Sequence, residues 1–208
     1  MQKKENKENE ILEAAEKLFA EKGFKGATTT LIAAEAGVTH AMLHYYFRTK
    51  DQIFLKVLDT YTEEIRQSLK SIMVSEINDT DFMRKVIEIS FDFFNEHSGQ
   101  MSLFFEVCKE RPELIKDYVD KLGKHIDPII RSHQEKVSEA VAGGQIKKIT
   151  FIDLIIDIIS VCAITPFLSP LLNNVLDLSE EQKKMFLEAR KHEAVELIAN
   201  RLTGKQLY

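Results

Sequence analysis

Residues that break regular structure are scarce in this chain. Of its 208 residues only eight are glycine and four are proline, and this composition favours long helices over sheets and turns. Apolar residues make up 44% of the chain and charged residues 29%, which is enough for a sizeable core beneath a polar surface. The length predicts one large domain or two modest ones.

Cysteine is scarcer still. Cys108 and Cys162 are far apart and belong to no Cys-x-x-Cys motif. The N-terminus shows no secretory signal, so we expect free, buried thiols in a reducing cytoplasm. Glu106, His125 and His133 lack the spacing of a metal site, and no pattern supports Cys108 as a nucleophile beside either histidine. We therefore expect no enzyme activity, no metal and no cofactor.

Long hydrophobic runs and excess basic charge are also missing. The most apolar stretch, Phe151 to Leu168, contains Asp153 and Asp157. These acids make membrane insertion costly, so we expect no membrane partner. The net charge is −5, but residues 1–50 hold eight Lys and Arg against seven Asp and Glu. A near-neutral head on an acidic body suits a protein that touches phosphates through one small surface.

The most informative segment is residues 28–47, which indicate two short helices joined by a tight turn. Thr28 and Thr39 are suitable N-caps, and Gly37 can supply the positive φ that the turn needs. Leu43 should anchor the second helix to the core, which leaves polar and aromatic side chains facing outward. A helix-turn-helix of this kind places its second helix in the major groove of DNA.

Helical spacing continues along the chain, and no strand pattern stands out. We predict an all-α fold of about nine helices. A first helix should run from Glu10 to Gly23, and capping boxes at Thr49/Gln52 and Ser179/Gln182 should begin two others. The helix that begins at Ser179 is expected near residues 180–202. The remaining helices are expected near residues 82–94, 101–108, 112–122, 125–142 and 151–173.

A known family shares the spacing of the helix-turn-helix segment. The DNA-binding signature of TetR/AcrR-type bacterial transcription regulators resembles the pattern Ile32-Ala33-x-x-Ala36-Gly37-Val38-x-x-x-x-Leu43-x-x-Tyr46-Phe47-x-x-Lys50. The family's first helix resembles Ile11-Leu12-x-Ala14-Ala15-x-x-Leu18-Phe19-x-x-x-Gly23-Phe24. The resemblance covers about Ile11 to Leu58. It implies a helix-turn-helix domain, residues 1–50, and a variable helical domain, residues 51–208, that binds a small molecule and pairs with a second subunit through its last two helices.

The predicted DNA contacts fall into two groups, because phosphate contacts set the register and base contacts set the sequence. Side chains on the outer side of the second helix are expected to read bases, and those flanking it to hold the backbone. His44 stands where the family commonly has a phosphate-binding tyrosine. We predict base contacts from Thr39, His40, Ala41 and Tyr45, and phosphate contacts from Thr28, Thr29, His44, Tyr46 and Lys50.

Two further sites are predicted in the second domain. Large aromatic and soft side chains suit an apolar ligand pocket, although an ordinary core explains them as well. The pocket set is Phe91, Phe94, Met101, Phe104, Phe105 and Cys108. The last two helices include a segment that is too apolar to cover only its own core, although burial within one subunit is the alternative. The expected dimer interface is Ile155, Ile159, Cys162, Phe167, Phe186, Ala194, Leu197 and Ile198.

These features predict a cytoplasmic, ligand-responsive transcriptional regulator. We expect it to bind a palindromic DNA operator as a homodimer and to be released by a small apolar or amphipathic effector. Repression is the commoner mode of the family that it resembles. The alternative is a helical protein-interaction module without sequence-specific DNA binding.

Overall fold

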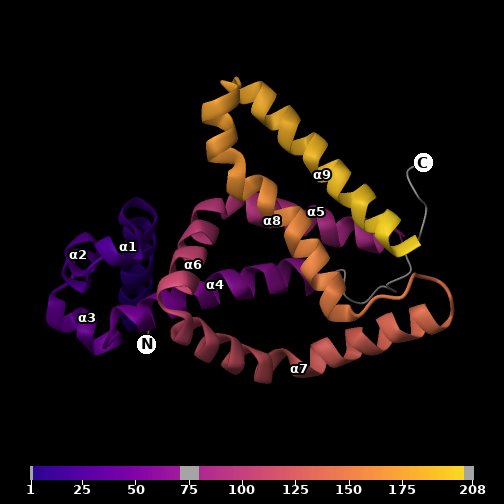
Figure 1. Cartoon of the computed structure of the whole chain (residues 1–208). Helices are drawn as coiled ribbons and strands as arrows, with labels where there is room; N and C mark the ends of the chain where they lie inside the picture. The colour runs from indigo at the N-terminus through magenta and orange to yellow at the C-terminus, as the bar shows by residue number, and fades with distance from the viewer. Residues whose placement is uncertain (1, 71–79, 204–208) are drawn as a thin grey trace. The chain divides into compact units, whose positions relative to one another are not determined.

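The structure is a computed structural model that describes residues 2–70 and 80–203 (Figure 1). The regular structure in these ranges is α-helical and includes no strand, so the all-α prediction is confirmed. The helices are α1 (Gln2–Gly26), α2 (Thr29–Glu35), α3 (His40–Tyr46), α4 (Lys50–Lys70), α5 (Thr80–Glu96), α6 (Ser98–Glu110), α7 (Pro112–Ala142), α8 (Phe151–Leu176) and α9 (Glu180–Thr203).

Two helix boundaries differ from those expected. Helix α1 begins at Gln2 rather than Glu10. Gly23 leaves the helical conformation, with φ 67° and ψ 175°, so the predicted stop is present as a kink followed by one last turn. Helix α7 runs unbroken where two helices were expected. One glycine, here Gly123, costs a helix only about 1 kcal/mol relative to alanine. Tyr118 before it and Val137 after it are buried, and their packing favours a helix that continues through the glycine.

The capping box predicted at Ser179/Gln182 is complete, and the one predicted at Thr49/Gln52 is present in part. At the start of α9 the Gln182 N–H donates to Ser179 Oγ at 3.3 Å, and the Ser179 N–H donates to Gln182 Oε1 at 2.9 Å. At the start of α4 the Gln52 N–H donates to Thr49 Oγ1 at 3.2 Å, while Gln52 Oε1 accepts from the Arg48 N–H. The bonds to Ser179 Oγ and Thr49 Oγ1 satisfy backbone donors that a helix N-terminus leaves without partners.

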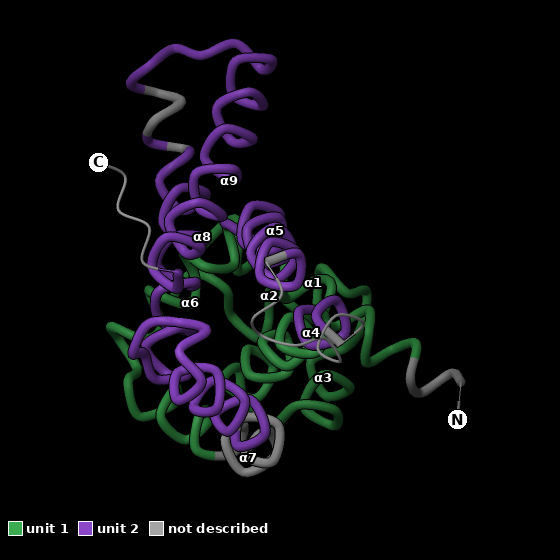
Figure 2. The backbone as a smooth tube through the Cα atoms, turned by 90° about the vertical axis from the view of Figure 1, so that its right-hand side faces the viewer, with its two compact units in different colours: residues 1–64, 99–122 green, residues 65–98, 123–208 purple. Residues whose placement is uncertain are grey.

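The chain divides into two compact units that interleave in sequence (Figure 2). Unit 1 holds residues 1–64 and 99–122, and unit 2 holds residues 65–98 and 123–208. Because α6 lies within unit 1, its Leu103 and Val107 share a core with the helix-turn-helix. The predicted domains, residues 1–50 and 51–208, stay a prediction.

The core of unit 2 is formed by α5, α8, α9 and the second half of α7. Helix α5 contacts both α8 and α9, which also contact each other (Figure 1). Ile87, Val137 and Cys162 are almost fully buried there. Burial raises the pKa of the Cys162 thiol to about 12, because it disfavours the charged thiolate. Both cysteines are free, as predicted, and Cys108 is half-buried.

Helix α8 contains a long apolar segment. Among the described residues, Phe151–Ser169 is long and apolar enough to cross a membrane, and a third of it is buried in the structure. The core helix of a soluble protein passes the same test of length and composition. Asp153 and Asp157 lie within the segment, so this feature alone is weak evidence for a membrane span.

Candidate nucleic-acid interface

The turn between α2 and α3 has the conformation that its sequence predicts. Gly37 adopts φ 62°, in the left-handed region that side chains other than glycine rarely enter. This conformation lets the Gly37 N–H donate to the Ala34 carbonyl at 3.2 Å and the Val38 N–H to the Ala33 carbonyl at 2.9 Å. The end of α2 is thus closed by a glycine cap, and the chain turns sharply into α3.

Threonine hydroxyls cap both helices. Thr28 Oγ1 accepts from the Leu31 N–H at 3.2 Å, and Thr39 Oγ1 accepts from the Met42 N–H at 3.1 Å. Each hydroxyl acts here as an acceptor, so its own hydrogen is still available for donation. Capping and a contact to DNA are therefore compatible at Thr28 and Thr39.

Helix α3 is anchored mainly by Leu43, and most of its other residues are exposed. Leu43 is fully buried, and Phe47, which follows the helix, is buried beside it in the core of unit 1. Tyr45 is 71% exposed. The other predicted base-reading residues, Thr39, His40 and Ala41, are exposed as well. The structure therefore exposes all four predicted base contacts on α3 and its N-cap, while Leu43 and partly buried Tyr46 hold the helix to the core.

Polar and aromatic contacts order this exposed surface. The Thr29 hydroxyl and His40 Nε2 are 3.1 Å apart, which joins α2 to α3. The His40 and His44 rings meet edge-on with centroids 4.3 Å apart. The Tyr45 and Tyr46 rings form a similar contact at 5.4 Å. Five of the nine predicted DNA-contacting side chains thus contact another member of the set.

Lys50 differs from the other predicted phosphate contacts. Its Nζ donates to the Phe24 carbonyl at 2.5 Å and lies 4.3 Å from the centre of the Phe24 ring. Burial, the largest cause, lowers the pKa of Lys50 because it disfavours the charged ammonium. One of the three ammonium hydrogens is therefore engaged within unit 1, and a phosphate contact would have to use the other two.

Sequence reasoning passed over Arg48. This residue follows α3 and is exposed, and its guanidinium forms no ion pair within the described part of the chain. A basic residue just after the last turn of α3 is the sequence signal that could have identified it as a phosphate contact. Arg48 is accordingly a more accessible cation than Lys50 on this surface.

The predicted ligand-pocket residues divide between the two units. Phe91 is buried in the core of unit 2, and Phe94 is partly buried against that core. In unit 1, Phe105 is exposed, and Met101, Phe104 and Cys108 are half-buried. Because these residues belong to different units, the predicted pocket stays a prediction. A shallow groove of about 310 Å³ within unit 1 includes Cys108 but no other residue of the set, and is otherwise lined by Pro112, Ile115, Lys116, Val119 and Asp120.

The predicted dimer residues also differ in exposure. Cys162, Ala194 and Ile198 are buried in the core of their own unit, so they offer little surface to a partner. Ile159 and Leu197 are both 44% exposed. Ile155, Phe167 and Phe186 are half-buried. Helix α8 exposes further apolar side chains that were not predicted: Ile152, Ile156, Ile164, Leu168 and Leu171.

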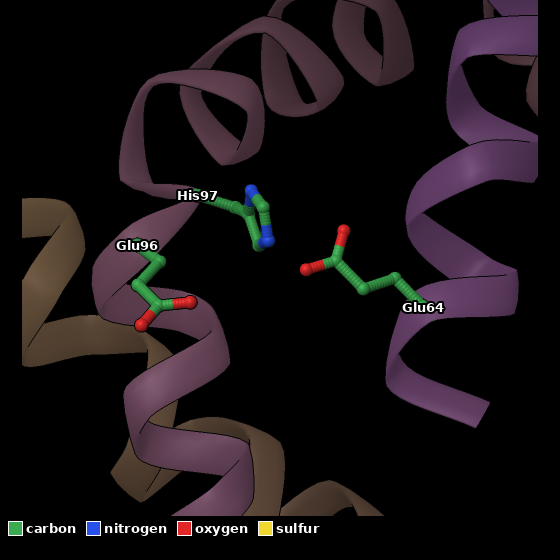
Figure 3. Close-up of side chains that lie close together, drawn as sticks. All are labelled: Glu64, Glu96 and His97. Carbon is green, nitrogen blue, oxygen red and sulfur yellow. The ribbon is translucent and has the colours of Figure 1, made fainter. Parts of the chain in front are cut away.

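Figure 3 shows acidic and imidazole side chains elsewhere in the chain. Glu64 comes from α4, Glu96 ends α5, and His97 follows it. Glu64 belongs to unit 1, whereas Glu96 and His97 belong to unit 2. Within unit 2 the centroids of the His97 and Phe93 rings are 4.5 Å apart.

Comparisons with known proteins agree with the geometry of unit 1. The family model described as "Bacterial regulatory proteins, tetR family" matches residues 11–57. The HTH-type transcriptional regulator YhgD of Bacillus subtilis, itself uncharacterized, is 24% identical over 137 residues, or 66% of this chain and 70% of YhgD.

Two solved structures show that the resemblance of fold extends over most of the chain. A Clostridium perfringens protein proposed to regulate fatty acid metabolism has a TM-score of 0.68, with 22% identity and coverage of 96% of this chain and 100% of that one. AibR, in complex with isovaleryl coenzyme A and operator DNA, has a TM-score of 0.64, with 15% identity and coverage of 92% and 97%.

Proposed function

We propose that this chain, which belongs to the TetR family of bacterial regulatory proteins, represses transcription by binding a palindromic operator as a homodimer in the cytoplasm. A small apolar or amphipathic molecule then releases it from the DNA. One observation carries the DNA-binding part of this proposal. Helix α3 is anchored to the core of unit 1 by buried Leu43 and partly buried Tyr46, and it exposes His40, Ala41, His44 and Tyr45.

Four residues of α3 and its cap are proposed to read bases. Tyr45 is the most exposed aromatic side chain of the helix. His40 can donate or accept at a base edge, and the Thr39 hydroxyl keeps a hydrogen to donate. Ala41 permits close approach and can contact a thymine methyl group. All four are exposed to solvent.

The proposed phosphate contacts flank this surface. Thr28 and Thr29 lie at the start of α2, and His44 and Tyr46 lie on the later turn of α3. Lys50 is proposed to add a contact through its remaining ammonium hydrogens. Arg48 joins this set, because an exposed guanidinium can bind a phosphate through two parallel hydrogen bonds.

A homodimer is proposed to form through α8 and α9. Exposed apolar side chains line α8, and Ile159 and Leu197 present the most accessible of the predicted contacts. Apolar area of this extent on a soluble protein usually marks an interface. Two heads on a symmetric dimer would read two half-sites about 34–36 Å apart, or a multiple of that spacing.

The effector is proposed to be a small apolar or amphipathic molecule. Phe104 of α6, which is half-buried in unit 1, supports this choice, since aromatic side chains commonly line ligand pockets. The AibR structure holds isovaleryl coenzyme A together with operator DNA, which makes short acyl thioesters a reasonable first probe. An effector must bind the DNA-free conformation more tightly than the DNA-bound one, or no release follows.

The DNA-binding proposal is tested by selecting duplexes from a random library with the full chain and titrating the selected duplex. We expect His40→Ala and Tyr45→Ala each to weaken binding by about 1–3 kcal/mol, and Ser138→Ala on α7 to have no effect. Arg48→Ala should weaken binding to selected and mixed-sequence duplexes alike and should reduce its salt dependence. Wild-type affinity in all three α3-region variants would contradict the assignment.

A further inference from the structure

The outer side of α3 carries two histidines one helical turn apart. His40 and His44 are separated by four residues, a spacing that makes side chains neighbours on a helix. Their ring centroids are 4.3 Å apart, and both side chains are exposed. Two imidazoles at this spacing can ligate one ion, as in metal sites built on a single helix.

We propose that His40 and His44 chelate a divalent transition-metal ion, with Zn²⁺ as the test ion, and that the bound ion competes with DNA. Neutral imidazole is a good ligand for zinc, copper and nickel ions. Zinc requires each ligating nitrogen to lie about 2.0–2.1 Å away, so the His44 ring, which meets that of His40 edge-on, would turn about χ2 to aim a nitrogen at the same ion. That torsion is broad for histidine.

The Thr29 hydroxyl supports such a site. It lies 3.1 Å from His40 Nε2. When Nε2–H donates to this hydroxyl, Nδ1 carries the lone pair that a metal needs. A hydrogen bond on the second ring nitrogen is the usual way in which proteins orient a metal-bound histidine. With two protein ligands, water would fill the ion's remaining positions.

Competition with DNA follows from where the two histidines lie, and this part of the inference rests on the proposed function. His40 is a proposed base contact and His44 a proposed phosphate contact. An imidazole nitrogen bound to zinc can no longer donate to or accept from DNA. The ion and its waters would also keep α3 away from the floor of the groove.

Other places could bind zinc, and two of them provide matched controls. The exposed His192 lies 3.8 Å from Glu196, one turn away on α9. Cys108 is a half-buried thiol, and burial raises its pKa, which disfavours the thiolate that binds metals. The variants His192→Ala and Cys108→Ser remove these ligands without changing α3.

The site itself is tested by calorimetric titration of the full chain with Zn²⁺, in the absence of DNA. We expect His40→Ala, His44→Ala and the polarity-preserving His44→Gln each to weaken the tightest zinc binding about tenfold or more. His192→Ala and Cys108→Ser should leave it unchanged, and Mg²⁺, which prefers oxygen ligands, should not bind there. Unchanged zinc binding in the α3 variants would overturn the site.

Competition is tested separately, by fluorescence anisotropy with a labelled mixed-sequence duplex at low salt. For the wild type we expect the apparent affinity to fall about tenfold when free Zn²⁺ is ten times its Kd, and not to fall in His44→Ala. Zinc bound at the pair with no effect on duplex binding would overturn the competition. A wild-type chain that binds no duplex in metal-free buffer would contradict the proposed function, while the calorimetric result would still decide the metal site.

Discussion

Replacing Gly37 with alanine tests the turn that aims α3. Gly37 has φ 62°, and a Cβ built there would meet nothing within 4 Å. The cost is therefore confined to the backbone, at about 1–2 kcal/mol for an L-residue in the left-handed region. A glycine-to-alanine change also lowers the conformational entropy of the unfolded chain, and this raises the free energy of unfolding by about 0.4–1 kcal/mol. We expect a net loss of about 1 kcal/mol in the free energy of unfolding.

Gly99 provides the matched control for this experiment. It lies near the start of α6 without a positive φ, and a Cβ there also meets nothing within 4 Å. Gly99→Ala should therefore stabilise the protein slightly, by up to about 1 kcal/mol. The difference between the two variants isolates the strain at Gly37. Gly37→Asn should lose less than Gly37→Ala, because asparagine tolerates this conformation.

Urea unfolding followed by circular dichroism measures these differences. For a chain of this length, 1 kcal/mol also corresponds to a shift of about 2–4 °C in Tm. A Gly37→Ala variant as stable as Gly99→Ala would refute the left-handed turn, and with it the orientation given to α3.

Four other outcomes are expected. Leu43→Ala should cost about 2–5 kcal/mol in unfolding free energy, since Leu43 is fully buried; a surface-like loss below that range would contradict its role as anchor. Ile159→Lys should convert a dimer to monomers in light scattering, and a wild-type monomer at micromolar concentration would contradict the dimer itself. A thiol reagent should label half-buried Cys108 before buried Cys162, and the reverse order would contradict the core of unit 2. Burial raises the pKa of Tyr118 to about 12, so unfolding free energy should fall as pH rises from about 10 towards 12, and should fall less in Tyr118→Phe.

Helix α3 and its caps were predictable because their signals are short-range in the sequence. The caps at Thr28 and Thr39 and the turn at Gly37 depend on residues within five positions of one another. Leu43 was identified as the anchor from helical spacing alone. Each feature is a local consequence of hydrogen-bonding groups or of an allowed backbone conformation, so the sequence is sufficient to place it.

Contacts between distant parts of the chain were not predictable in this way. Lys50 donates to the carbonyl of Phe24, 26 residues earlier, although its position suggested a phosphate contact. Arg111 binds Asp51 through two hydrogen bonds, at 3.3 and 2.9 Å, across 60 residues. Such pairs depend on tertiary packing, in which α6 and the start of α7 join the unit of the helix-turn-helix.

The predicted pocket and interface show the same limit. Apolar spacing placed Cys162 and Ile198 among the dimer contacts, yet both are buried within their own unit. The hydrophobic pattern of a helix marks which side chains avoid water. It does not tell whether the same subunit or a second one covers them, and the number of exposed isoleucines on α8 became apparent only from the structure.

Protection of guanine N7 from methylation tests the central claim most directly, because N7 is reached only through the major groove. On the selected operator duplex, the wild-type chain should protect N7 atoms in two patches about 34–36 Å apart, or a multiple of that distance, and His40→Ala should lose that protection. Tight binding with every N7 atom still reactive would show that α3 does not enter the major groove.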